Sequence, residues 1–213
     1  MRQEVGFGML VIRHRINDLN SLAALPQGVP VEVDIHAFGD RLTVHHDALS
    51  EGVPFEEWLF FAGRRFAIFN IKEEGIEDQV LGMVGNSEID DFFLLDLSFP
   101  SLVKMIRRGE KRVALRVSEY EHYSAAVEFG DALDWVWLDC FEGFPLDMQG
   151  CKAMNEAPTK ICLVSPELHG PHRSDRDVFD FQRQLSDFGL IIDAVCTKSP
   201  NLWLQLARQD NDV

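Results

Sequence analysis

Short apolar runs alternate with helical patterns along the chain. Extended runs are predicted at 9–14, 30–36, 65–71, 92–98, 112–117, 135–140, 160–164 and 193–197. Most of these runs are continuously apolar, which is typical of parallel strands that helices cover on both faces. A further extended run at 41–45 follows the turn signal Gly39-Asp40, which predicts a hairpin.

Amphipathic segments between the strands predict the helices. They are expected at 17–25, 55–61, 76–87, 101–108, 120–129, 147–155, 177–188 and 200–207. Eight strand–helix units in 213 residues match a compact α/β fold, the (β/α)8 TIM barrel. A doubly wound open sheet is the alternative fold. No linker, repeat or low-complexity stretch divides the chain, so we expect one domain over residues 1–213.

The composition argues against binding to nucleic acid or to an anionic membrane. The chain has 20 Lys and Arg and 35 Asp and Glu, a net charge of -15, and no basic run offsets it. No apolar run is long enough for a membrane span, and the N-terminus lacks a signal-peptide pattern, so a cytoplasmic protein is expected. The cysteines are predicted to be buried reduced thiols: Cys140, Cys151, Cys162 and Cys196.

Polar side chains stand at or just past the C-terminal end of successive predicted strands. They are His14, Glu32, Asp34, Asn70, Lys72, Asp96, Arg116, Asp139, Glu167 and Thr197-Lys198. In a barrel these strand ends meet at one mouth, where active sites of this fold are built. Ordinary polar loop residues are the alternative interpretation.

Glu32 and Asp34 carry the most specific signal. They alternate with apolar residues in one predicted strand, so both carboxylates point to the same face. Burying two like charges side by side is unfavourable unless a cation lies between them. Carboxylate oxygens suit a hard divalent ion such as Mg2+ or Ca2+. We therefore predict a metal here, with His14 and His46 arriving from neighbouring segments.

Three short motifs, in this order and spacing, resemble glycerophosphodiester phosphodiesterases, a family of (β/α)8 barrels. They are His14-Arg15, Glu32-x-Asp34 and His46-Asp47. The wider superfamily includes phosphatidylinositol-type phospholipases and sphingomyelinase-D-like lyases. Weaker similarity continues to the end of the chain, at Asn70-Ile-Lys72, Ser98-Phe99 and Thr197-Lys-Ser-Pro200.

The resemblance implies a metal-dependent phosphodiesterase that hydrolyses a small glycerophosphodiester-like substrate. It implies catalytic His14 and His46, metal ligands Glu32, Asp34 and Asn70, and phosphate contacts Arg15 and Lys72. Because histidine titrates near neutrality, one imidazole can accept a proton while the other donates one. The metal and the lysine would stabilise charge that develops on the phosphoryl oxygens.

Two later residues are further candidates for substrate binding. Arg116 either pairs with Glu119 or grips a substrate anion, and the second is favoured because a phosphate site in an acidic protein needs cations. Glu167 lies on the loop after the seventh predicted strand, where it either touches the substrate or faces solvent.

The chain also departs from the family pattern. The family's His-Arg-Gly reads His14-Arg15-Ile16, its Pro-Glu-Asn-Thr is missing, and the link after Asp47 is short. Its third metal carboxylate is Asn70 here, so the site should hold a divalent ion less tightly. Two alternatives remain open: a non-catalytic barrel of the same origin that binds a phosphoryl ligand or a partner, and a Schiff-base aldolase using Lys72 or Lys198.

Overall fold

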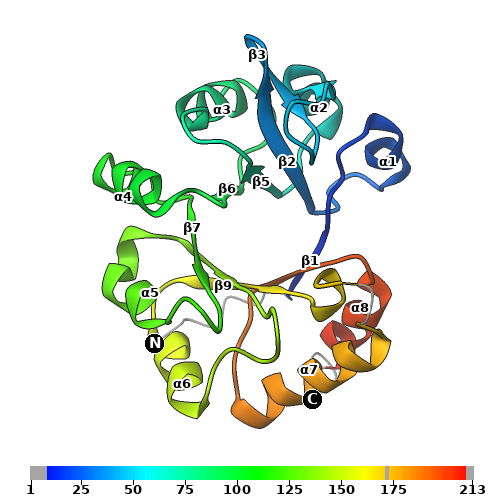
Figure 1. Cartoon of the computed structure of the whole chain (residues 1–213). Coiled ribbons are helices and arrows are strands. Elements are labelled where there is room, and N and C mark those ends of the chain that lie inside the picture. The colour runs from blue at the N-terminus through cyan, green and yellow to red at the C-terminus, as the bar shows by residue number, and fades with distance from the viewer. Residues whose placement is uncertain (1–8, 171–172, 210–213) are drawn as a thin grey trace. The chain divides into compact units, whose positions relative to one another are not determined.

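The computed structural model describes residues 9–170 and 173–209 of the chain, which form two compact units (Figure 1). Unit 2 is the continuous segment Arg13–Arg108. Unit 1 contains the described residues of Met1–Ile12 and Gly109–Val213. Strand β1 (Leu10–Arg13) contributes to both units, so the N-terminal strand belongs to unit 1 except for its last residue. The single domain over residues 1–213 stays a prediction.

Unit 2 is organised around three parallel strands in the order β2 (Val31–Phe38), β5 (Ala67–Ile71) and β6 (Phe92–Leu95). The predicted hairpin is confirmed, because β3 (Arg41–Val44) pairs antiparallel with β2. A two-residue strand that the sequence pattern did not predict, β4 (Val53–Pro54), continues this hairpin by pairing with β3.

The helices of unit 2 are α1 (Leu19–Ala24), α2 (Phe55–Ala62), α3 (Glu77–Val84) and α4 (Phe99–Arg107). The Asp18 side chain caps α1 by accepting the Ser21 N–H, which satisfies one of the free donors at the helix start. Aromatic rings of Phe55, Trp58 and Phe69 pack together, and all three are fully buried.

Unit 1 contains four parallel strands in the order β7 (Ala114–Val117), β8 (Trp135–Leu138), β9 (Lys160–Val164) and β10 (Ala194–Thr197). Strand β1 lies next to β10, and the Leu10 N–H donates to the Asp193 carbonyl at 2.9 Å. Both faces of these strands are largely buried, as continuous apolar runs predict.

The helical segments of unit 1 are α5 (Ser124–Phe129), η1 (Gly130–Ala132), α6 (Met148–Glu156), η2 (Pro166–Leu168), α7 (Asp175–Phe188) and α8 (Pro200–Gln209). Alternate strand residues such as Val136 and Ile161 form one core with Met154 of α6, Val178 of α7 and Trp203 of α8. The predicted helix at 120–129 begins late, because residues 118–121 form a turn closed by two backbone hydrogen bonds.

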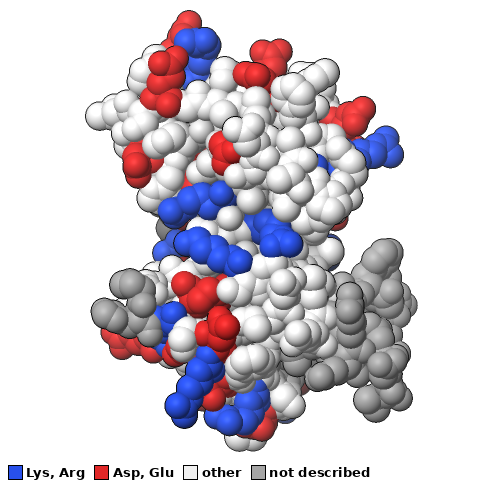
Figure 2. Space-filling model, turned by 90° about the vertical axis from the view of Figure 1, so that its right-hand side faces the viewer, with Lys and Arg blue, Asp and Glu red and all other residues white. Residues whose placement is uncertain are grey.

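The predicted mixed α/β architecture is confirmed, and closure into a (β/α)8 barrel stays a prediction. All four cysteines are buried and free, as expected. Among the described residues, no helix is both long and apolar enough to cross a membrane. The chain carries a net charge of -15, and Figure 2 shows acidic side chains in both units on the face that it presents.

Candidate active site in unit 2

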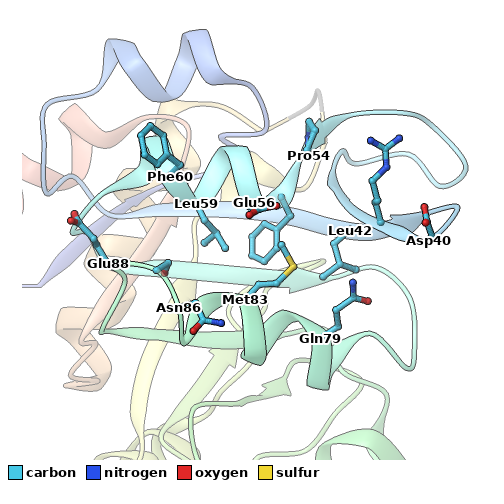
Figure 3. Close-up of a pocket in the computed structure, with 13 residues that line it drawn as sticks. Asp40, Leu42, Pro54, Glu56, Leu59, Phe60, Gln79, Met83, Asn86 and Glu88 are labelled. Carbon is cyan, nitrogen blue, oxygen red and sulfur yellow. The ribbon is translucent and has the colours of Figure 1, made fainter.

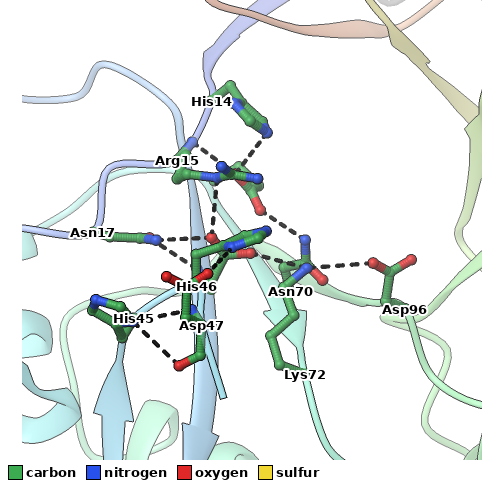
Figure 4. Close-up of polar contacts among 11 residues, drawn as sticks. His14, Arg15, Asn17, His45, His46, Asp47, Asn70, Lys72 and Asp96 are labelled. Carbon is green, nitrogen blue, oxygen red and sulfur yellow. Dashed lines mark hydrogen bonds and ion pairs between the residues drawn. The ribbon is translucent and has the colours of Figure 1, made fainter. Parts of the chain in front are cut away.

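Glu32 and Asp34 lie side by side on strand β2, next to Asn70 on the neighbouring strand β5. Glu32 and Asp34 project from the same face of β2, and both side chains are only 1% exposed. The register of the parallel strands makes Asn70 of β5 the direct partner of Asp34. The structure therefore brings these three residues together, and their role as metal ligands stays a prediction; Figure 4 shows Asn70 near Lys72.

Glu32 is surrounded by nitrogen atoms from two segments, β5 and the residues that follow β1. The Asn70 Nδ2 donates to Oε1 at 2.9 Å, and the Arg15 backbone N–H donates to Oε2 at 2.7 Å. The His14 Nε2 lies 3.8 Å from Oε2. Arg15 adopts a left-handed backbone with φ of 56°, which is uncommon for a residue other than glycine. In this strained conformation the Arg15 N–H points at the buried Glu32 carboxylate.

Asp34 is held by one amide and two cations. Its carboxylate accepts the Asn17 Nδ2 at 2.7 Å, and its own N–H donates to the Asn17 Oδ1 at 3.0 Å. The Lys72 Nζ lies 3.0 Å from Oδ1 and the Arg15 Nε lies 3.4 Å from Oδ2. Lys72 also lies 3.6 Å from Asp96 Oδ2. Asn17 was missed as a site residue, because it begins the helix predicted over 17–25.

The oxygen atoms of this cluster fit a hard cation. Two buried carboxylates are adjacent, and the buried Oδ1 of Asn70 has no hydrogen-bond partner among the described residues. In the described part of the chain no three His, Cys, Asp or Glu side chains form a metal-binding group. The third oxygen here comes from an amide, so only two of the predicted ligands are charged.

The pKa of Glu32 is raised to about 7, chiefly because burial penalises the charged carboxylate and also because Asp34 is close. Hydrogen bonds from Asn70 and Arg15 act in the opposite direction, as does the charge of Lys72. The carboxylate pair therefore carries an unfavourable charge interaction that a further cation would relieve.

This pKa predicts how stability depends on pH. The folded-state pKa of Glu32 lies above its ordinary value of 4.5, so the folded protein binds the proton more tightly than the unfolded chain. Its contribution is therefore favourable below pH 4.5 and is lost as the pH rises through about 7. Glu32→Gln should remove this dependence, so the melting temperature of the variant relative to wild type should increase from pH 5 to pH 8.

Thermal melting in metal-free buffer measures this effect. Glu88→Gln is the matched control, because Glu88 is exposed in the same unit and should melt like wild type at both pH values. A constant difference between Glu32→Gln and wild type over this pH range would contradict the raised pKa.

The second predicted catalytic histidine lies on the loop after β3. The His46 Nδ1 is 2.8 Å from Asp47 Oδ1, and its side chain is 44% exposed. The hydrogen bond from His46 lowers the pKa of Asp47, with smaller contributions from the charges of His46, His45 and Arg15. The contact supplies His46 with a carboxylate partner, as His14 has in Glu32. Figure 4 shows His46 directed at Asp47.

The predicted substrate contact Arg116 lies in unit 1, at the end of β7. Its Nε is 3.6 Å from Asp139 Oδ2, and its guanidinium lies 5.7 Å from the centre of the Phe141 ring. The Glu119 carboxylate accepts backbone N–H groups of residues 141–143, and its pairing with Arg116 stays an untested alternative. His169 joins this cluster, with Nε2 2.6 Å from Asp139 Oδ1.

Glu167, also in unit 1, connects the ends of β9 and β10. Its carboxylate accepts the hydroxyl groups of Ser165 and Thr197 and the backbone N–H of Lys198 at 3.1 Å. The side chain is therefore fixed by the protein and does not belong to a solvated loop. Its role in substrate binding, like that of Arg116, stays a prediction.

A separate cavity of about 850 Å3 lies in unit 2 against helices α2 and α3 (Figure 3). Apolar side chains of Leu42, Phe55, Leu59 and Met83 line it together with polar residues of the rim. None of the predicted catalytic, metal or phosphate-binding residues lines this cavity. It is therefore distinct from the Glu32 and Asp34 cluster.

Parallel strands connected by helices define an α/β protein, a class in which active sites are commonly built on the strands and the loops that follow them. Solved structures with a similar fold are glycerophosphodiester phosphodiesterases. Two are from Parabacteroides distasonis ATCC 8503. One has a TM-score of 0.61 and 14% identity over 96% of this chain and 98% of that chain. The other has a TM-score of 0.65 and 9% identity over 98% of this chain and 89% of that chain.

A third structure, the glycerophosphodiester phosphodiesterase from Agrobacterium tumefaciens str. C58, has a TM-score of 0.59 and 12% identity over 91% of this chain and 98% of that chain. No protein-family model and no curated protein sequence matches the chain. The resemblance to this family predicted from the sequence is thus confirmed, as a likeness of fold.

Proposed function

We propose that the protein is a metal-assisted phosphodiesterase acting on a small glycerophosphodiester-like substrate. The observation that carries this proposal is the convergence, within unit 2, of His14, Arg15 and Lys72 on the buried pair Glu32 and Asp34. Cations beside a water-poor carboxylate pair suit the binding of a phosphodiester, whose charge must be stabilised as the ester bond breaks. The likeness of fold to glycerophosphodiester phosphodiesterases supports the same reaction class.

In this proposal Glu32, Asp34 and Asn70 would hold Mg2+ or Ca2+, which stabilises negative charge on phosphoryl oxygens when bound. Lys72 and Arg15 bind the phosphate. One imidazole removes a proton from the attacking hydroxyl, of water or of the substrate, and the other donates a proton to the departing alcohol oxygen. In this proposal His46, whose Nδ1 lies 2.8 Å from Asp47 Oδ1, takes the donor role.

Release of alcohol from a panel of glycerophosphodiesters, with and without Mg2+ or Ca2+, tests the proposal. Wild-type protein should turn over at least one substrate, and Asp34→Asn purified in the same way should not. Absence of turnover over the panel, together with absence of metal binding, would refute the enzyme. A ligand-induced thermal shift that persists in His14→Ala and His46→Ala would then identify the non-catalytic phosphoryl-binding alternative.

A further inference from the structure

The chain supplies its own cation to Asp34. The ammonium of Lys72 lies 3.0 Å from Oδ1, closer than the Arg15 Nε is to Oδ2, at 3.4 Å. The Lys72 contact is an ion pair without the alignment of a hydrogen bond, since Oδ1 has no hydrogen-bond partner among the described residues. The lysine is therefore attracted by charge and is not locked in place by geometry.

The charges in the cluster explain why a cation lies there. Glu32 and Asp34 bring two carboxylates into a buried position, and Asn70 and Asn17 contact them with neutral amides. Buried charge is unfavourable without a partner of opposite sign. Lys72 pairs with Oδ1 of Asp34, while Asn17 donates to the other oxygen, Oδ2.

A second carboxylate lies within reach of the same ammonium. The Lys72 Nζ is 3.6 Å from Asp96 Oδ2, and the side chains of Lys72 and Asp96 are both partly exposed. Lys72 therefore has a partner outside the buried pair. A small movement of its flexible side chain would exchange one carboxylate for the other, with the ammonium still paired.

We propose that Lys72 and a divalent cation compete for Asp34. In the metal-free protein the ammonium stands in for the metal, and metal binding transfers Lys72 toward Asp96 and the substrate phosphate. The inference rests on the proposed metal-assisted function and adds an internal competitor to it. Because the cluster has only two carboxylates, it cannot fully compensate both cations at Asp34, and the competition weakens metal binding.

Calorimetric titration with Mg2+ and with Ca2+ tests this competition. Lys72→Met should bind the cation at least about tenfold more tightly than wild type, because the change removes one positive charge at contact distance. Lys72→Arg keeps that charge and should bind like wild type. Lys104→Met, which removes an exposed lysine from α4 in the same unit, is the matched control and should also bind like wild type.

The binding site is checked with Lys72→Met combined with Asp34→Asn, which should lose the added affinity. Equal or weaker binding by Lys72→Met, or retention of the gain in the double variant, would overturn the competition. Thermal melting provides a second readout: metal should raise the melting temperature of Lys72→Met more than that of wild type. An equal or smaller rise would also overturn it.

These measurements need no turnover, so the two proposals fail separately. If the wild type is active and Lys72→Met does not change the metal affinity, the proposed enzyme stands and the competition is excluded. If the wild type is inactive but Lys72→Met binds metal more tightly, the competition stands and takes place at a non-catalytic site.

Discussion

Alanine in place of His14 is expected to lower kcat for a glycerophosphodiester by about 10²- to 10⁴-fold, the usual contribution of a positioned acid or base. His14 follows β1 and its Nε2 lies 3.8 Å from Glu32, so its loss removes proton transfer beside the buried acids. His46→Ala should have an effect of the same order, because it removes the imidazole paired with Asp47. Steady-state kinetics at saturating substrate and metal measures both effects.

The control for these variants is His122→Ala, which removes an exposed histidine of unit 1 and should leave kcat unchanged. Circular dichroism should show that all three variants remain folded. The double variant His14→Ala/His46→Ala should lower kcat by less than the product of the two single fold-changes, since the effects of residues that act as one unit are not additive. Wild-type kcat in either single variant would remove that histidine from the catalytic assignment.

Trp58→Ala is expected to lower the free energy of unfolding by about 3–5 kcal/mol, the usual range for deletion of a large buried aromatic side chain. Trp58 is fully buried, and its ring packs against Phe55 and Phe69. Its Nε1 donates to the Ile16 carbonyl at 2.9 Å, directly after His14-Arg15. The same side chain therefore supports the core of unit 2 and positions the segment that contacts Glu32.

Urea denaturation followed by circular dichroism measures this loss. Phe60→Ala on the same helix is the matched control, because its ring is 80% exposed and the change should stay within about 0.5 kcal/mol of wild type. Trp58→Phe retains an aromatic ring but removes the hydrogen bond, at a cost of about 1 kcal/mol from that bond. A loss for Trp58→Ala no larger than that for Phe60→Ala would contradict the packing.

Strand periodicity explains how much of the site was predictable. Glu32 and Asp34 follow a period of two, so their common face could be predicted without coordinates. The meeting of Asp34 with Asn70 follows from the expectation that neighbouring strands run parallel. Both statements depend only on local patterns and on the order of strands, which sequence reveals well.

The contacts around these acids were not predictable, because they depend on three-dimensional proximity and unusual backbone geometry. No sequence rule assigns Arg15 a φ of 56°, and the pairing of Asn17 with Asp34 joins a residue before a helix to a strand. Two buried acids indicated a cation, and the sequence interpretation placed only a metal there. That Lys72 lies at 3.0 Å from one of them depends on the side-chain conformation after β5.

The path of the chain between the units has a consequence for biosynthesis. All residues of unit 2, and with them Glu32, Asp34 and Asn70, emerge from the ribosome before β10 is made. Strand β1 must therefore wait until residue 193 has been made before Leu10 can meet Asp193. Vectorial synthesis consequently makes the segment with the candidate acids available for folding first, and truncation before β10 would deprive β1 of its neighbour in unit 1.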